Sequence, residues 1–185
     1  MDAPDCHFTH VFTNFAVVLI PNPRAALAEM HRVLRPGGTV AFTIWKSVGW
    51  WASTAAAIAR IPGAPALPSF AAFSNKFDVD YAPGGDWIDP AYFEARVREA
   101  GFAPDSVRSE LRENVTRNAS AEEHVAVYAP MTRAMMGRFW SAEECARVTP
   151  HFDEALLAAV KEMYGDGEVV LKWEAYCITA KKAAA

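Results

Sequence analysis

The sequence is short of the features that mark several large classes of protein. It has only three cysteines in 185 residues, an odd number without a Cys-x-x-Cys pair, which predicts reduced thiols and neither a disulfide framework nor a zinc site. No apolar run is longer than that from Phe15 to Ile20, which is far below the roughly 18 residues of a membrane span. The first residues lack the positive charge with which a signal peptide begins. These absences favour a cytoplasmic protein that does not bind a membrane.

A strong charge of one sign is also lacking. The chain carries 18 Lys and Arg against 22 Asp and Glu, a net charge of −4, and the basic residues are scattered. A nucleic-acid binder would need a basic stripe to displace counterions, so this class is excluded. By contrast, 52% of the residues are hydrophobic, enough for a core, and 12% are aromatic, which favours a small-molecule pocket. The length predicts one domain over residues 1–185.

A strand, a helix and a second strand follow each other near the N-terminus. Residues 8–14 alternate and are rich in β-branched and aromatic side chains, which predicts a strand. Asn22 and Pro23 predict the start of a helix that ends at residues 35–38. Residues 39–45 are nearly all apolar, as in a strand buried on both faces of a sheet. The unit is therefore a βαβ unit with parallel strands.

The rest of the chain alternates between predicted helices, strands and one long loop. The loop, residues 62–90, is rich in proline and aromatic residues and is interpreted as a lid or a substrate-binding segment. Ser120 and Ser141 each predict a helix start, because each is followed by a Glu three residues later. The other predicted helices are residues 49–61, 90–100 and 152–164, and the other strands are residues 107–115 and 168–181.

Six segments carry a resemblance to a known family: residues 8–15, 21–23, 28–38, 39–45, 100–102 and 174–182. Together they resemble the second half of a class I S-adenosylmethionine-dependent methyltransferase, of the small-molecule group that includes fungal biosynthetic enzymes. The resemblance implies an α/β fold. Its Rossmann-like sheet would hold strands equivalent to the family's fourth to seventh, with helices on both faces.

The family's donor-binding elements have no counterpart in these 185 residues. Such an enzyme begins with a glycine-rich turn of the GxGxG type and a carboxylate that grips the ribose; here no GxGxG occurs. The resemblance therefore implies a truncated sheet with no cofactor site. In that sheet the strand of residues 8–14 lies at an exposed edge, so a homodimer through this edge and the adjacent helices is predicted, with a methyltransferase partner as the alternative.

Candidate site residues fall into two groups. Asn14 and Phe15 match the point where the family's fourth strand ends beside the reacting groups, and Trp45 ends the fifth; the alternative is that Asn14 caps a turn and Trp45 packs in the core. The predicted catalytic residues are Asp78, Asp80, Tyr81 and His10, and Phe77 and Trp87 join the substrate-binding set. The alternatives are a solvated loop whose aspartates cap turns and a structural histidine. The remaining helix histidines, His31, His124 and His151, are expected to face solvent, and no metal site is predicted.

Three functions remain open on these residues. The first is a cofactor-independent enzyme of secondary-metabolite biosynthesis, a cyclase, isomerase or dehydratase that orients a small molecule and moves protons on it. The second is a non-catalytic subunit of an intact methyltransferase. The third is a methyltransferase completed by strands supplied from another chain. Fold alone does not choose between them.

Overall fold

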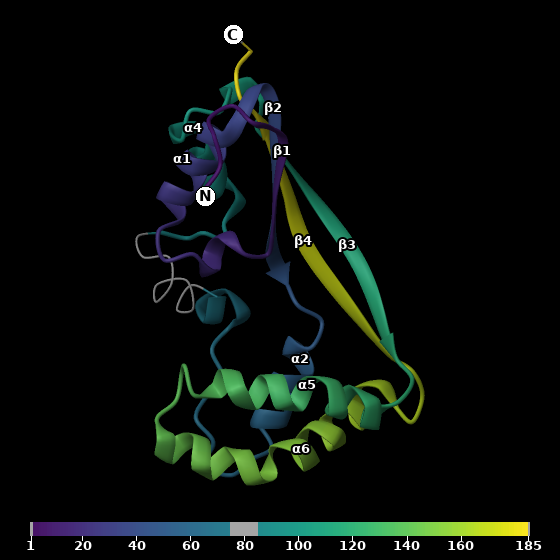
Figure 1. The fold of residues 1–185 in the computed structure, drawn as a ribbon. Helices are drawn as coiled ribbons and strands as arrows, with labels where there is room; N and C mark the ends of the chain where they lie inside the picture. The colour runs from purple at the N-terminus through teal and green to yellow at the C-terminus, as the bar shows by residue number, and fades with distance from the viewer. Residues whose placement is uncertain (1, 75–84, 185) are drawn as a thin grey trace. The chain divides into compact units, whose positions relative to one another are not determined.

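The computed structural model describes residues 2–74 and 85–184, which form two compact units (Figure 1). Unit 1 comprises residues 1–46, 71–113 and 174–185 as far as they are described, and unit 2 comprises residues 47–70 and 114–173. Strands β3 (Arg108–Asn118) and β4 (Val169–Lys181) contribute residues to both units.

Unit 1 begins with the predicted βαβ unit. It consists of β1 (Phe8–Asn14), the short 3-10 helix η1 (Val17–Leu19), α1 (Pro23–Val33) and β2 (Leu34–Ser47). Asn22 caps α1, because its Oδ1 accepts a hydrogen bond from the Ala25 N–H at 3.0 Å. β1 and β2 pair in parallel, with Asn14 opposite Thr43, so the predicted parallel unit is confirmed.

The sheet has the strand order β1-β2-β4-β3 and is mixed. β4 runs antiparallel to β2, since Gly37 and Gly38 bond to Lys182 at one end and Lys46 pairs with Glu174 at the other. This order confirms the α/β fold class predicted from the sequence. It also places β1 at one edge of the described sheet and β3 at the other.

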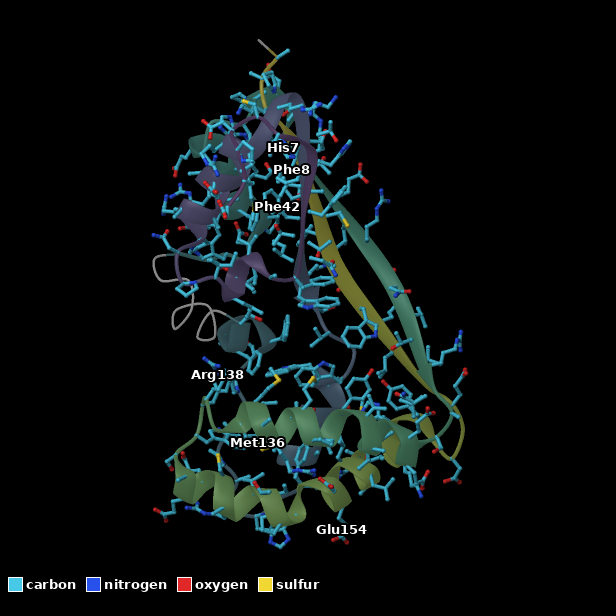
Figure 2. All side chains as sticks on the ribbon, in the orientation of Figure 1. His7, Phe8, Phe42, Met136, Arg138 and Glu154 are labelled. Carbon is cyan, nitrogen blue, oxygen red and sulfur yellow. The ribbon has the colours of Figure 1, made fainter. Side chains whose placement is uncertain are left out.

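The core of unit 1 lies on one face of the sheet. Alternate residues of β2, Val40, Phe42 and Ile44, are buried against α1 and α4 (Pro90–Glu99), and Phe42 is labelled in Figure 2. The alternating residues of the other face are only half-buried. The expectation that this strand is buried on both faces is therefore confirmed for one face only. It was wrong for the other face, because the described helices of unit 1 pack on one side of the strand.

Unit 2 is built mainly from helices α2 (Trp51–Ile58), α5 (Ala121–Met136) and α6 (Ala142–Tyr164), with α5 and α6 side by side (Figure 1). Ser120 and Ser141 cap α5 and α6 as predicted, and Ser141 with Glu144 forms a full capping box. Apolar side chains of all three helices meet in the second core, together with Val169 and Leu171 of β4.

The prediction of a separate helix over residues 152–164 was wrong. The structure has one helix, α6, which continues through Pro150. Val148, Phe152 and Leu156 are fully buried at a spacing of four residues, so one continuous apolar face holds the helix together on both sides of the proline. This burial outweighs the hydrogen bond that a proline removes from a helix interior.

Part of the predicted lid over residues 62–90 lies outside the described residues, which stop at residue 74 and resume at residue 85. The connection between η2 (Pro104–Ser106) and α4 is made at Gly101, whose φ of 97° suits glycine and ends α4 as predicted. Within the described part of the chain, no helix combines the length and the apolar character needed to cross a bilayer.

Candidate functional site

The carboxyl ends of the two parallel strands bring three predicted residues together in unit 1. Asn14 is the last residue of β1, Phe15 follows it, and Trp45 lies near the end of β2. Ligands of open α/β sheets bind beyond the carboxyl ends of parallel strands, so this is the end at which a site is expected. We call Asn14, Phe15, Thr43 and Trp45 the strand-end cluster.

Thr43 of β2 holds the turn after β1 in place. The Phe15 N–H donates to the Thr43 carbonyl oxygen at 3.2 Å and to its Oγ1 at 2.9 Å. Thr43 Oγ1 in turn donates to Asn14 Oδ1 at 2.6 Å. Phe15 has a φ of 51°, in the left-handed region that costs a non-glycine residue about 1 kcal/mol. The hydrogen bonds to Thr43 compensate for this strain.

The strained turn presents the Phe15 ring to Trp45. The two rings are parallel within 5°, and their centroids are 3.7 Å apart. Both side chains are half-buried, so the pair offers apolar ring surface to solvent or to a ligand. The cluster thus combines a polar carboxamide with a flat apolar surface.

A charged pair follows the cluster along β2. Lys46 Nζ donates to Glu174 Oε1 of β4 at 3.0 Å. The Glu174 carboxylate raises the pKa of Lys46, so the ammonium group remains charged at neutral pH. Lys46 can attract an anion but cannot act as a neutral base under these conditions.

His10, a predicted catalytic residue, is not part of the cluster. It precedes Asn14 by four residues on β1, which corresponds to about 13 Å in an extended strand. Its exposed ring stacks on Phe12 at a centroid distance of 6.0 Å, and its Nδ1 lies 3.1 Å from Thr9 Oγ1. Its position therefore supplies no proton donor or acceptor to Asn14.

The other predicted residues do not join the cluster either. Phe77, Asp78, Asp80 and Tyr81 lie outside the described residues. Trp87 is fully buried in the core of unit 1, with its ring edge-on to the rings of Tyr92 and Phe93 at 5.5 and 5.8 Å, respectively. In this structure Trp87 is a fully buried core side chain, and its contact with a substrate stays a prediction.

A buried polar pair in unit 2 was missed by the sequence analysis. His124 of α5 is fully buried, so the expectation that it faces solvent was wrong. Its Nε2 lies 3.1 Å from Ser53 Oγ, and Ser53 Oγ donates to the Trp50 carbonyl oxygen at 2.9 Å. Because the only hydroxyl hydrogen of Ser53 goes to Trp50, His124 Nε2–H must be the donor in the pair. We call Ser53 and His124 the core pair.

The opposite ring nitrogen of His124 carries no hydrogen. Nδ1 is buried and has no hydrogen-bond partner within residues 2–74 and 85–184. Burial lowers the pKa of His124, which keeps the imidazole neutral. The spacing of α5 does not distinguish this histidine from one on the exposed face, so its burial could not be predicted from the sequence pattern.

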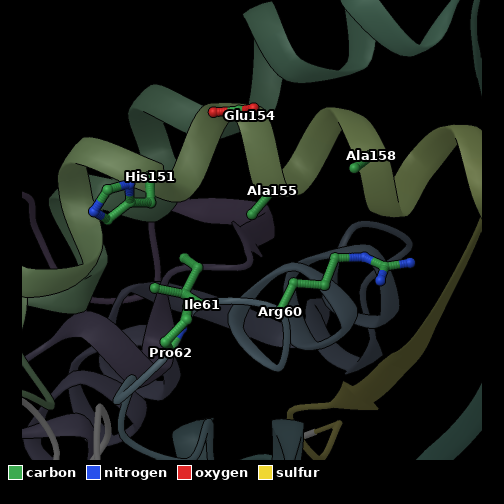
Figure 3. Close-up of a pocket in the computed structure, with 7 residues that line it drawn as sticks. All are labelled: Arg60, Ile61, Pro62, His151, Glu154, Ala155 and Ala158. Carbon is green, nitrogen blue, oxygen red and sulfur yellow. The ribbon is translucent and has the colours of Figure 1, made fainter.

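A surface pocket of about 270 Å³ also lies in unit 2, where α6 meets the residues after α2 (Figure 3). Its charged side chains are exposed, and the Arg60 guanidinium is paired with Glu162. Exposed charges are well solvated, which makes this pocket a weaker candidate than the strand-end cluster. The lining residues are Arg60, Ile61, Pro62, His151, Glu154, Ala155 and Ala158.

Metal binding finds no support in the described residues. Within residues 2–74 and 85–184, no three His, Cys, Asp or Glu side chains are grouped closely enough to hold a metal ion. The three cysteines are free thiols.

Comparisons with known proteins agree with this fold. A family described as "Methyltransferase domain" matches residues 1–42. The methyltransferase tpcH of Aspergillus fumigatus is 26% identical over 180 residues, covering 97% of this chain and 61% of that protein. The acetylaranotin bis-thiomethyltransferase of Aspergillus terreus is 27% identical over 169 residues, covering 90% of this chain and 53% of that protein.

One solved structure supports the fold alone. The YcgJ protein of Bacillus subtilis superposes with a TM-score of 0.50 at 14% identity, over all of this chain and 68% of that one. The chain therefore has a methyltransferase-like α/β fold and is similar along most of its length to methyltransferases, while it spans about half to three-fifths of the length of these two relatives.

Proposed function

We propose that this chain supplies the acceptor-binding side of an S-adenosylmethionine-dependent methyltransferase that acts on a small organic molecule. The observation that carries the proposal is the similarity to named methyltransferases over 90–97% of the chain. One of those relatives is named for methyl transfer to sulfur of a small molecule, which supports an acceptor of that size.

The strand-end cluster is the proposed acceptor site. Asn14 provides a polar group at the carboxyl end of β1, and the parallel rings of Phe15 and Trp45 provide a flat apolar surface beside it. A small molecule held between a directed hydrogen bond and a ring surface is fixed in orientation, and orientation is a large part of what a methyl-transfer site must supply.

The residues of this chain do not fit the methyl donor by themselves. The sequence has no GxGxG turn, whose glycines would let the backbone approach the donor, and the four residues of the strand-end cluster include Asn14 but no Asp or Glu. We therefore assign to these residues the binding and orientation of the acceptor only.

A second candidate function does not involve the methyl donor, and the absence of a GxGxG turn from these 185 residues is compatible with it. In it, the chain works without the donor, as a cofactor-independent cyclase, isomerase or dehydratase on a natural-product-like molecule. Acid-base groups would come from the predicted loop carboxylates Asp78 and Asp80, and the strand-end cluster would orient the substrate.

The open edge of β1 is the proposed interface for a second copy of the chain. β1 is outermost in the order of the described strands, and its Phe8 and Phe12 side chains are 39% and 74% exposed, respectively. Exposed edges with apolar side chains pair readily with another strand. Sedimentation should show a dimer that Phe12→Lys dissociates and that Leu111→Lys, an exposed control on β3, leaves intact; a monomeric wild type contradicts the proposal.

Deleting the gene and comparing metabolites tests the two functions against each other. Methyl transfer replaces a hydrogen by a methyl group, so the compound that accumulates should be lighter than the lost product by one CH2 group. A donor-independent enzyme instead predicts an accumulated isomer of the lost product, or one that differs by a single water. The mass difference between the two compounds overturns one of the proposals.

Calorimetric titration of the purified chain with S-adenosylmethionine tests the assignment of the donor site. We expect no heat of binding from this chain, because the donor-binding turn is not among its residues. Micromolar binding contradicts that assignment, and titration with S-adenosylhomocysteine serves as the control for a nucleoside site.

A further inference from the structure

Thr43 occupies a position in the strand-end cluster that packing alone does not explain. Its Oγ1 accepts the Phe15 N–H at 2.9 Å and lies 2.6 Å from Asn14 Oδ1. A hydroxyl has one hydrogen and two lone pairs. With one lone pair taken by Phe15, the hydrogen is left for the Asn14 carboxamide.

The short distance decides which end of that carboxamide faces Thr43. Hydrogen bonds from O–H to O centre near 2.7–2.8 Å, roughly 0.2 Å shorter than those from N–H to O. At 2.6 Å the neighbour of Thr43 Oγ1 is thus the Asn14 oxygen. The opposite orientation would also leave the Thr43 hydroxyl hydrogen without its acceptor in the cluster.

Asn14 Nδ2 consequently points away from Thr43. It carries two N–H donors, and the Asn14 side chain is exposed. The half-buried rings of Phe15, the next residue in the chain, and of Trp45, two residues after Thr43 on β2, belong to the same cluster. Hydrogen-bond donors and a flat ring surface are therefore presented at one strand end.

We propose that Thr43 is a positioning residue that fixes the Asn14 carboxamide as a donor, so that the cluster selects flat aromatic ligands bearing a carbonyl or carboxylate oxygen. The inference deepens the proposed function and rests on it for the presence of a small molecule at this end of the sheet. The oxygen accepts from Asn14 Nδ2, while the ring stacks on the Phe15–Trp45 pair.

Two probes that differ in one group test this selection on the full chain. 4-Hydroxyacetophenone carries a carbonyl oxygen, and 4-ethylphenol has the same ring and hydroxyl without it. The chain should bind the ketone about tenfold more tightly, the difference made by one hydrogen bond. The NMR signals of the Asn14 side-chain amide, identified by their loss in Asn14→Asp, should shift with the ketone and not with the ethyl compound.

Variants of Thr43 separate positioning from a merely structural role. Thr43→Val should abolish the preference for the ketone while leaving the affinity for 4-ethylphenol, whereas Thr43→Ser should restore the preference, because it keeps the hydroxyl. Thr39→Val, a substitution on the same half-buried face of β2, is the matched control and should leave the preference unchanged.

The inference is overturned if neither probe binds the wild-type chain, or if both bind equally. It is also overturned if Thr43→Val keeps the tenfold preference. Should Thr43→Val fail to fold, the wild-type amide shifts alone decide, because shifts that do not distinguish the probes contradict the donor orientation. If gene deletion shows no mass difference of CH2 while the chain still prefers the ketone, methyl transfer is rejected. The positioning role of Thr43 is then retained.

Discussion

Two hydroxyl side chains, Thr43 in unit 1 and Ser53 in unit 2, each join a backbone group to a polar side chain, but in opposite surroundings. Thr43 bonds to the exposed Asn14, beside two half-buried rings. Ser53 bonds to His124, and both members of this core pair are at most 1% exposed. The local chemistry is similar, and the burial is not.

Because of this difference in burial, the exposed hydrogen bond can serve ligand binding, whereas the buried one contributes to stability. At the strand end, the hydroxyl leaves a donor of Asn14 facing outward, where a ligand can use it. In unit 2 the hydroxyl satisfies an N–H that has no access to water, and an unsatisfied N–H there costs about 1–3 kcal/mol. A polar group is thus a candidate for function where it is exposed and a contributor to folding where it is sealed.

The largest expected effect concerns the two tryptophans that the sequence analysis assigned to the substrate. Trp87→Ala should lower the free energy of unfolding by about 3–5 kcal/mol, because it opens a cavity in the core of unit 1. Trp45→Ala should cost about 1–2 kcal/mol, since its ring is only half-buried. Urea denaturation measures both changes. If Trp87→Ala lowers the free energy of unfolding no more than Trp45→Ala does, Trp87 is not the core side chain described above and becomes a candidate for substrate contact again.

Removing the two hydroxyls should give the next largest contrast. Ser53→Ala leaves His124 Nε2–H buried without a partner and should lower the free energy of unfolding by about 1–3 kcal/mol. Thr43→Val should lower it by less than about 1 kcal/mol, because water can reach Asn14. Thermal and urea unfolding measure both variants. If Ser53→Ala and Thr43→Val lower the free energy of unfolding equally, burial does not distinguish the two hydrogen bonds.

The smallest expected contrast between the two sites is that the stability contributed by the core pair depends on pH. Burial lowers the pKa of His124 from 6.5, so the unfolded chain binds a proton that the folded chain does not. Stability from this residue is complete above about pH 6.5, and below it the unfolding constant should rise up to tenfold per pH unit until the folded pKa is reached. The ring of Tyr128 packs on the His124 ring, with their centroids 4.7 Å apart.

Variants isolate this pH dependence from that of other histidines. His31 in unit 1 also has a lowered pKa, through burial and the nearby Lys182, and contributes in the same direction. His124→Gln should therefore lower by one the number of protons that the chain takes up on unfolding, which makes its stability less dependent on pH. His151→Gln, an exposed control on α6, should leave this number unchanged. NMR titration of the wild-type His124 ring gives the same answer directly, and a ring that titrates near pH 6.5 refutes the prediction.

The sequence predicted the local elements well, because their signals lie within a few residues. Asn22, Ser120 and Ser141 cap helices as expected, and β1 and β2 pair in parallel. The resemblance also placed Asn14, Phe15 and Trp45 at strand ends, where the structure brings them together.

What the sequence could not predict depends on register and on burial. Thr43 joins the cluster because it lies opposite Asn14, and pairing register is set by the packing of whole strands. His124 is buried where α5 lies against Ser53 of α2, and the pattern of one helix does not reveal a partner on another. Pro150 continues α6 for the same reason, since tertiary packing overrides a local breaker.

The backbone of Phe15 has a consequence for how this position can change over evolution. Its φ of 51° is one that glycine adopts without strain and phenylalanine does not. Selection for folding alone therefore pulls the position towards glycine, and selection for the stacked ring pulls it back. Homologous sequences with glycine here would mark descendants in which the ring is dispensable, and those that keep an aromatic residue would mark lineages in which it is still used.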